Sequence, residues 1–427
     1  MVKIFRKVTD HPAVQHLGPG LITGAADDDP SGIATYSQAG AQFGYNMLWT
    51  VIFTYPLMAG IQMVSARLGC ITGKGLAANI REQMPVWVLY LVVALLLVAN
   101  TINIAADIAA MAEATRMLAG GSIHLYAIMF GLLCLVLQVF MSYERYVRYL
   151  KWLTLALLSY VAVVFTINVP WLEVLQRAVW PKMDWDNDTI TMVVAVFGTT
   201  ISPYLFFWQA AQEMEDLRSV RNSNSGGVNP EMTKAEARRH LRRIRWDTLV
   251  GMGFSNLVAF FIILSTAATL HANGMTNIQT SAQAAEALRP LAGEFTFLLF
   301  SLGIIGTGLL AIPVLAGSAA YAVAEAFDWR TGLDLKPDEG QRFYSIVAAA
   351  TIGGILLCFT PIDPMKELFY SAVINGVIAV PIMAVMMWLG TNQKVMGAFA
   401  IGRRLRILGW LATAVMAVAV IAMFLTI

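Results

Sequence analysis

The stretch GPGLITGAADDDPSGIATYSQAG, residues 18–40, combines an apolar helical pattern with three consecutive aspartates. It is long enough to cross a membrane, which takes about 20 mostly apolar residues. Pro30 follows Asp29 at its centre, where a proline removes a backbone donor and leaves carbonyls unpaired. Backbone groups freed at that depth are tolerated only where they line a cavity. The stretch therefore predicts a membrane helix that is broken at its middle.

A second stretch of the same kind, VVAVFGTTISPYLFFWQAAQ, covers residues 193–212 and carries Pro203 among hydroxyl residues. It belongs to the sixth predicted span, five spans after the first. An odd number of spans per unit gives two halves of opposite orientation, and paired broken helices in inverted repeats indicate the site of a secondary transporter. We expect inverted repeats over about 12–175 and 185–391, and an extra C-terminal helix at about 406–427.

The composition indicates an all-α polytopic membrane protein. Hydrophobic residues make up 58% of the 427 residues and charged residues only 13%, which is too few charges to cover the surface of a soluble protein. We expect one membrane domain, 1–427, with about eleven transmembrane helices. The predicted spans are 18–40, 47–71, 86–118, 123–142, 149–169, 190–214, 248–271, 295–326, 342–360, 366–390 and 406–427.

The basic residues predict the orientation of the chain. If the N-terminus is cytoplasmic, 24 of the 29 lysines and arginines lie in cytoplasmic segments, as the positive-inside rule requires. Arg145, Arg148 and Lys151 are in this group, and the polar segment 216–247 holds eight of them. An odd number of spans then places the C-terminus outside. Because the formal charge is only +2, no nucleic-acid partner is indicated.

The three aspartates are candidates for a cation site. A buried carboxylate costs several kcal/mol unless a partner compensates it. Successive helical residues point about 100° apart, so all three cannot face one ion. Asp29, where the helix opens, is the expected direct ligand, with Asp27 and Asp28 lining the approach or bonding to neighbouring helices. The alternative is that Asp29 only caps the half-helix that begins near Ser31, because Asp before Pro is a normal N-cap arrangement.

The sixth span supplies hydroxyl groups around its proline. These groups and the freed carbonyls are hard oxygen donors, the ligands that Mg²⁺ takes. Helix packing is the alternative, since Ser and Thr hydroxyls often bond to carbonyls within membrane helices. The candidate metal ligands are Asp29, Thr199, Ser202 and Tyr204, with carbonyls near Ser31, Gly32 and Thr199.

Polar residues inside other predicted spans include Asn100, Asn103, Asp107 and Glu113 of the third span and Asn375 of the tenth. Asp107 of the third span is either a relay carboxylate or an internal hydrogen-bond partner. Asn375 of the tenth span is a weaker candidate ligand. Polar groups at this depth are costly and usually face the interior of a bundle.

Both broken stretches resemble the Nramp family of divalent-metal transporters. Gly18-Pro19-Gly20, Asp29-Pro30-Ser31-Gly32 and Gln38-Ala39-Gly40 match the family's glycine-proline-glycine entry, its DPGN metal motif and its QAG. Residues 198–205 match the family's GATVMPHN stretch. The resemblance implies a LeuT-type fold, with two inverted five-helix repeats plus one extra helix, and helices one and six broken in mid-membrane.

The departures from these motifs concern the metal ligands. The family's metal-binding Asp is retained as Asp29, but its Asn becomes Gly32 and its metal-binding Met becomes Ser202. Thr199 stands at the small residue whose carbonyl can coordinate metal. The resemblance thus implies a wider, all-oxygen site, which suits Mg²⁺ entering with part of its water shell. The pattern is similar to that of the Nramp-related magnesium transporter branch.

The residues implied in proton coupling also differ. The family's two sixth-span histidines correspond to Tyr204 and Gln209, neither of which titrates near neutral pH. Its Asp-x-x-Glu relay survives only as Asp107, with Ala110 in the place of the Glu. We therefore expect transport without protons, with Mg²⁺ moving down its electrochemical gradient.

The predicted function is Mg²⁺ import across the inner (plasma) membrane by alternating access, with no enzymatic activity. The metal is a substrate and no cofactor is expected; the bilayer is the other partner, and no obligate protein partner is indicated. The alternative is a proton-coupled Mn²⁺ or Fe²⁺ transporter of the standard family type. A receptor on this scaffold would need an appended signalling domain, and the predicted spans leave no stretch long enough for one.

Overall fold

The computed structural model describes residues 19–141, 154–225, 233–333, 335, 336 and 338–426. Throughout these residues the regular structure is helical, and no strand occurs. The predicted all-α architecture is confirmed. Gly18 and the basic residues Arg145, Arg148 and Lys151, which entered the predictions, lie outside the described residues.

Both predicted breaks occur, and each lies at its proline. The halves are α3 (Pro19–Asp27) and α4 (Pro30–Phe43) for the first span, and α12 (Asn187–Thr200) and α13 (Pro203–Ser225) for the sixth. Pro30 and Pro203 each stand at the first position of the second half-helix. A missing N–H costs no internal hydrogen bond there, and the fixed φ suits the helix. The proline thus separates the two halves and starts the second one.

Each of the other nine predicted spans contains a helix. They are α5 (Leu48–Thr72), α7 (Val86–Ala119), α8 (Ile123–Phe140), α10 (Leu158–Val164), α14 (Lys234–Thr269), α17 (Thr296–Ala326), α18 (Gln341–Leu357), α19 (Pro364–Thr391) and α21 (Arg403–Thr426). Among the described residues, eight stretches are long and apolar enough to cross a membrane, whereas α18 and the segment Leu155–Val164 are shorter. The predicted fifth span is described only from Thr154, where η2 (Thr154–Leu157) leads into α10.

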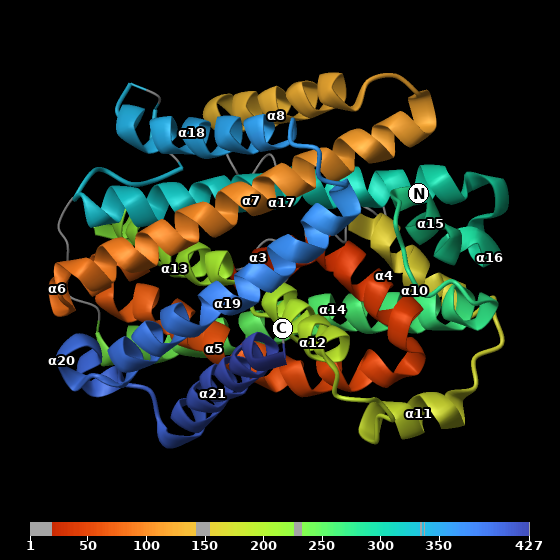
Figure 1. The fold of residues 1–427 in the computed structure, drawn as a ribbon. Coiled ribbons are helices and arrows are strands. Elements are labelled where there is room, and N and C mark those ends of the chain that lie inside the picture. The colour runs from red at the N-terminus through yellow and green to blue at the C-terminus, as the bar shows by residue number, and fades with distance from the viewer. Residues whose placement is uncertain (1–18, 142–153, 226–232, 334, 337, 427) are drawn as a thin grey trace, which may run out of the picture.

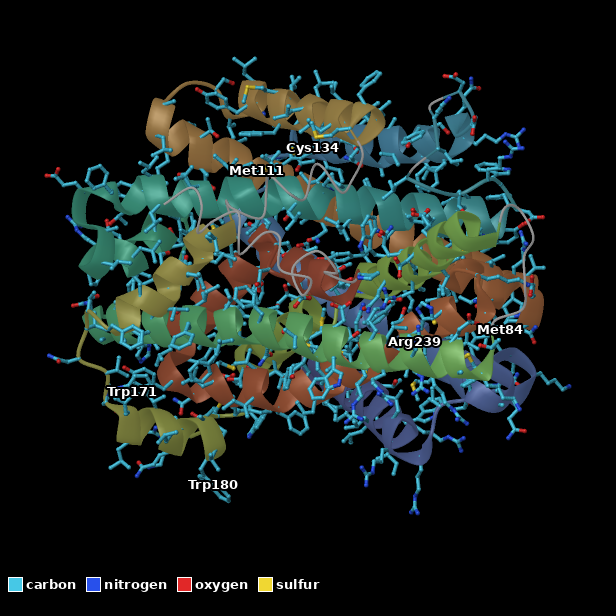
Figure 2. All side chains as sticks on the ribbon, turned by 180° about the vertical axis from the view of Figure 1, so that it is seen from behind. Met84, Met111, Cys134, Trp171, Trp180 and Arg239 are labelled. Carbon is cyan, nitrogen blue, oxygen red and sulfur yellow. The ribbon has the colours of Figure 1, made fainter. Side chains whose placement is uncertain are left out.

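Short helices connect the long ones. They are α6 (Leu76–Gln83), α11 (Trp171–Val179), α15 (Ser281–Ala285), α16 (Arg289–Ala292), α20 (Gln393–Met396), η1 (Gly44–Met47), η3 (His271–Asn273), η4 (Glu286–Leu288), η5 (Gly293–Phe295) and η6 (Gly397–Phe399). In α11, Val174 is buried whereas Leu172 is exposed. Figure 2 shows Trp171 and Trp180 near its two ends, at the margin of the molecule. Tryptophans are enriched where a protein crosses the membrane–water boundary.

The sixth, broken span lies inside the bundle. In its most apolar window 89% is buried, against 33% for α21 and 22% for α8. In Figure 1, α8 and α18 lie together along one edge, α7 and α17 follow beneath them, and α3 lies near the middle. Helices that are enclosed in this way have protein rather than lipid around their polar groups, as the predicted breaks require.

The first half-helix, α3, packs directly against α14. A Cβ on Gly24 would lie 2.3 Å from the carbonyl of Gly251, and one on Gly20 would lie 2.8 Å from the amide nitrogen of Thr248. The Gly20 N–H donates to the Asp247 carboxylate at 2.8 Å. This bond satisfies one of the free N–H groups at the start of α3. The two glycines therefore set how closely α3 approaches α14.

We expect Gly24→Ala to destabilise the protein. The new methyl group would overlap the backbone of Gly251, so α3 must shift, and overpacking of this kind costs about 1–3 kcal/mol. Thermal unfolding of the purified protein in detergent measures the effect. Gly303→Ala in α17 is the control, because its Cβ would come no closer than 3.8 Å to the neighbouring side chains. A melting temperature of Gly24→Ala that matches the control would contradict the close contact.

Candidate metal centre

Asp29 occupies the gap between α3 and α4 and caps α4. Its Oδ1 accepts hydrogen bonds from the Gly32 N–H at 2.8 Å and from the Ser31 hydroxyl at 2.6 Å. The carboxylate also lies at the N-terminus of a half-helix, where the helix dipole favours negative charge. The capping that was considered as an alternative is therefore present, and it occupies one of the two carboxylate oxygens.

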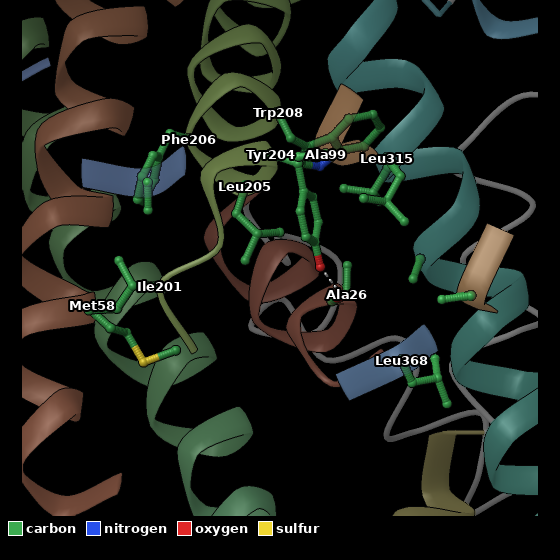
Figure 3. Close-up of a cluster of buried hydrophobic side chains, with 14 of the residues drawn as sticks. Ala26, Met58, Ala99, Ile201, Tyr204, Leu205, Phe206, Trp208, Leu315 and Leu368 are labelled. Atoms are coloured by element: carbon green, nitrogen blue, oxygen red, sulfur yellow. Dashed lines mark hydrogen bonds between the residues drawn. The ribbon is translucent and has the colours of Figure 1, made fainter. Parts of the chain in front are cut away.

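The other oxygen of Asp29 faces two further helices. Oδ2 accepts from the Asn103 amide of α7 at 3.0 Å and from the Tyr204 hydroxyl of α13 at 3.4 Å. The same hydroxyl lies 3.1 Å from the Ala26 carbonyl at the end of α3, the bond drawn in Figure 3. A hydroxyl has one proton to donate, so Tyr204 can satisfy only one of these acceptors fully. Oδ2 therefore keeps capacity for another positive partner.

The pair Asp363-Pro364 shows what the same dipeptide does when it only caps a helix. Asp363 starts α19 and accepts from the Met365 N–H at 2.9 Å, and it is exposed. Asp29 is only 2% exposed and also faces side chains from two other helices. A cap does not require that burial, which is costly for a carboxylate. Asp29 is therefore more deeply buried, and has more side-chain partners, than helix capping requires.

Thr199 of α12 comes close to α4 at Gly32. A Cβ on Gly32 would lie 3.1 Å from the Thr199 Oγ1 and 3.6 Å from the Asp29 Oδ1. Gly32 thus leaves space between a hydroxyl and a carboxylate. Within the part of the chain that the structure describes, the buried Thr199 Oγ1 has no hydrogen-bond partner. A buried polar atom without a partner is costly, which makes this oxygen a candidate donor to an ion or its water.

Ser202 is turned toward its own helix. Its hydroxyl donates to the carbonyls of Gly198, at 3.0 Å, and Thr199, at 2.8 Å. These are terminal carbonyls of α12, which have no partner within the helix. The packing role considered for the sixth-span hydroxyls therefore holds for Ser202. Its contribution to the site is a small side chain and an oxygen whose lone pairs remain available.

Asp27 and Asp28 both face Ser255 of α14. The Ser255 hydroxyl lies 2.5 Å from the Asp27 Oδ2 and 3.0 Å from the Asp28 Oδ1. One hydroxyl proton serves two carboxylates, and the Asp27 Oδ1 has no partner among the described residues. The expectation that these two aspartates bond to a neighbouring helix is met by Ser255.

Asp107 and Asn375 are buried at the centre of the bundle. Neither carboxylate oxygen of Asp107 and neither polar atom of the Asn375 side chain has a hydrogen bond of normal geometry to the described residues. Asp107 follows Asn103 by four residues on α7, so both lie on the face that meets Asp29. Asp107 also interacts with the backbone N–H of Ser31 at the start of α4, so the relay and hydrogen-bond roles considered for it both remain open. Asn375 lies on α19, which packs against α12.

Two partners of the aspartates had no role assigned from the sequence: Asn103 was noted only as a polar residue of the third span, and Ser255 was not noted. Asn103 donates to Asp29 from another helix, and its spacing from Asn100 and Asp107 places all three on one face of α7. That spacing could have identified it. Ser255 carries no comparable signal, because a single serine in an apolar helix is common. No group of three His, Cys, Asp or Glu side chains suited to a metal occurs in the described residues.

A surface cavity of mixed polar and apolar lining lies beside α4 and α12. Its volume is about 560 Å³, and amide side chains line it, among them those of Gln38, Asn187 and Asn277. A smaller cavity of about 180 Å³ shares Gln38 and Asn277 and reaches Ala34, one helical turn beyond Pro30. Asp188 also lines the larger cavity and Lys366 the smaller one, so one carboxylate and one ammonium group stand beside the amides.

A helical membrane bundle with two interior helices that break around buried polar groups has the architecture of a secondary transporter. The chain belongs to the Nramp family: the family model, described as natural resistance-associated macrophage protein-like, matches residues 20–426. This membership confirms the predicted class, a multi-pass membrane transporter and not an enzyme.

Relatives and solved structures agree with this assignment. The divalent metal cation transporter MntH of Klebsiella pneumoniae is 25% identical over 411 residues, which cover 93% of this chain and 91% of the relative. The protein of the same name from Yersinia pestis is 26% identical over 405 residues, 92% and 90% of the two chains.

Solved structures confirm the predicted LeuT-type fold. The Eremococcus coleocola manganese transporter superposes with a TM-score of 0.73 at 16% identity, covering 95% of this chain and 85% of that one. Mhp1, a nucleobase-cation-symport-1 family transporter, gives 0.58 at 14% identity, with 96% and 92% covered. At sequence identities of 16% and 14%, the similarity to these structures shows a common fold and nothing more specific.

We expect Tyr204→Phe to lower the free energy of unfolding by about 1–3 kcal/mol, because the Ala26 carbonyl would be left buried without a donor. Tyr55→Phe is the matched control. It also removes a hydroxyl that donates to a carbonyl, that of Leu249, but at a half-buried position. Thermal melting of both variants in detergent measures the difference. Equal losses would contradict a special role for the Tyr204 hydroxyl at the break.

Proposed function

We propose that the protein imports Mg²⁺, partly hydrated, through a site centred on Asp29. The observation that carries the proposal is the donor set around this carboxylate, which consists of oxygen atoms. The expected ligands are Asp29, Thr199, Ser202, Tyr204 and the carbonyl of Gly32. The names of the relatives, divalent metal cation transporter and manganese transporter, support a divalent cation as the substrate class.

The absence of a soft ligand favours a hard ion. From Thr199 to Gln209 the sequence holds no Cys, Met or His. Thiolates, thioethers and imidazoles favour softer transition metals, whereas carboxylate, carbonyl and water suit Mg²⁺. Mg²⁺ gives up its water reluctantly and commonly binds through one or two carboxylates. A single buried carboxylate with small neighbours at Gly32 and Ser202 meets that requirement.

Further polar residues on either side of Asp29 extend the proposed path of the ion. Asp27 and Asp28, held by Ser255 at the α14 interface, would attract the ion along its inner part. Ser31 and Asn375 are candidate donors to water molecules that accompany it. Negative charge along the path raises the local concentration of cations.

Transport without proton coupling is the second part of the proposal. Gln209 donates to the Thr248 hydroxyl at 3.1 Å and is fully buried, and neither it nor Tyr204 titrates near neutral pH. Asp107 would be the only relay group left, with Ala110 following it. An inside-negative potential of 100 mV contributes about 4.6 kcal/mol to a divalent cation, at about 2.3 kcal/mol per charge. That potential can drive uptake without protons.

The proposed location is the plasma membrane, with the N-terminus inside and the C-terminus outside. In this orientation the amide-lined cavity opens outward, and the close packing of α3 against α14 closes the inner side. We assign inverted repeats to about 12–175 and 185–391, related across the two breaks, and the helix at about 406–427 stands outside them.

Asp29→Asn is expected to abolish Mg²⁺ uptake while the protein stays folded. Asparagine caps helices as well as aspartate does, so the variant removes the charge and keeps the cap. Proteoliposomes with an inside-negative potential, a Mg²⁺ indicator and a pH indicator measure uptake and proton entry together. Wild type should take up Mg²⁺ without acidification at any pH between 6 and 8, roughly the range in which His would titrate.

The matched control is Asp363→Asn, the other Asp-Pro cap of a membrane helix, which should transport like wild type. Metal-dependent acidification would contradict uncoupled transport and favour the proton-coupled Mn²⁺ or Fe²⁺ alternative. Full uptake by Asp29→Asn would contradict the assigned ligand.

Ser202→Met is expected to shift preference from Mg²⁺ toward Mn²⁺. A thioether would replace a hard oxygen next to the ion, and soft ligands favour transition metals. Competition of Mn²⁺ against Mg²⁺ uptake in the same liposomes measures the ratio. Ser202→Leu is the control, because it adds similar volume without sulfur. If both variants show the same ratio, the effect is one of volume and the ligand argument is wrong.

A further inference from the structure

Asn103 of α7 uses only one half of its amide group within the described structure. Its side chain is fully buried, and its Nδ2–H donates to the Asp29 Oδ2 at 3.0 Å. The amide oxygen, Oδ1, has no hydrogen-bond partner among the described residues. A buried polar oxygen without a partner is costly. Asn103 therefore brings an available hard oxygen donor next to the proposed metal ligand.

Asn100, three residues earlier on α7, shows what a structural amide does on the same helix. Its Nδ2 donates to the Leu315 carbonyl at 2.8 Å and to the Ser318 hydroxyl at 2.7 Å, so it holds α17 to α7. It is as deeply buried as Asn103, and its oxygen also lacks a partner among the described residues. The two asparagines thus differ in what the nitrogen faces, which is a neighbouring helix for Asn100 and the proposed metal ligand for Asn103.

The distance of 3.0 Å between the Asn103 nitrogen and the Asp29 oxygen is also that between neighbouring ligands of Mg²⁺. This ion takes ligands at the corners of an octahedron with bonds of about 2.0–2.1 Å, which places adjacent oxygens about 2.8–3.0 Å apart. An amide exchanges its oxygen and nitrogen, with almost no change of shape, by a half turn about χ2. After that turn, the Asn103 Oδ1 and the Asp29 Oδ2 can occupy two adjacent corners with both helices in place.

The nitrogen that turns away from Asp29 has an acceptor in Asp107. This residue follows Asn103 by four positions, and helical side chains lean toward the N-terminus, so its carboxylate leans toward the amide. A carboxylate has about four acceptor positions. Asp107 can therefore accept from the amide in addition to its interaction with the Ser31 N–H. The turn exchanges one acceptor of the nitrogen for another and frees the Asp29 Oδ2 for the ion.

We propose that Asn103 is a further ligand of the transported cation, and that its amide turns to present Oδ1 when the ion binds Asp29. The inference rests on the proposed function, because it concerns the same site. The amide oxygen is a hard, neutral ligand, which suits Mg²⁺ better than a softer transition metal. The ion then joins α7 to the break between α3 and α4, so that a third part of the bundle responds to its arrival.

Asn103→Cys tests for direct contact with the ion. A thiolate is a soft ligand, so Cd²⁺ should inhibit Mg²⁺ uptake into proteoliposomes by this variant at concentrations about tenfold or more below those needed for wild type. Asn100→Cys is the matched control, equally buried on the same helix, and should keep the wild-type sensitivity to Cd²⁺. A purely structural role of Asn103 would not move this ratio. Equal sensitivity of the two cysteine variants would overturn the proposal.

Asn103→Leu and Asn103→Asp separate the role of the oxygen from that of the nitrogen. Leucine removes both and should raise the half-saturating Mg²⁺ concentration about tenfold or more. Aspartate keeps an oxygen and removes the donor, so uptake should persist. Melting temperatures in detergent identify folded variants, and loss of uptake in folded Asn103→Asp would contradict the ligand role. If wild type takes up no Mg²⁺, the proposed function fails; if wild type does and Asn103→Leu matches it, this inference alone fails.

Discussion

The carboxylate of Asp29 is buried at a point where a membrane helix lacks its internal backbone hydrogen bonds. The packing of the central helices compensates both the buried charge and these missing hydrogen bonds. Donors come from the start of α4, from Asn103 of α7 and from Tyr204 of α13. Tyr204 also reaches the carbonyl of Ala26, so one hydroxyl joins the end of α3 to the acid beyond it. Moving any of these helices leaves a buried charge or carbonyl without a partner, which costs more than the bond itself contributes.

The two sides of the break are built differently, and the proposed transport cycle depends on that difference. Toward one surface, amide side chains line an open cavity. Toward the other, α3 is held to α14 through its glycines, through Asp247 and through Ser255. Ser255 is the partner of Asp27 and Asp28, and it lies on the helix from which α3 must separate for the inner side to open. Separation would therefore release two carboxylates at the moment when a cation needs a path inward.

The sequence predicted those features that depend on one helix at a time. Helix breaks at Pro30 and Pro203 follow from a missing donor, and the span positions follow from apolar length. Contacts that depend on how helices rotate against each other were not predictable in this way. Ser255 meets the aspartates because of a rotation that hydrophobic periodicity leaves free in all-apolar helices. The bonds of Ser202 are local and correspond to the packing alternative that the sequence had suggested. The short α11 was missed for another reason, since nine residues are too few to register as a span.

Capping and ion binding by Asp29 are compatible because they use different oxygens. The cap engages Oδ1 with two donors and draws on the helix dipole. Oδ2 faces an amide and a hydroxyl that has a second acceptor in Ala26. An incoming cation could take the place of Tyr204 on Oδ2, and the hydroxyl would then donate fully to the carbonyl. The site can thus bind an ion while every donor stays paired and Asp29 still caps α4. The free-energy cost of binding and releasing the ion therefore stays small in the helix that must move.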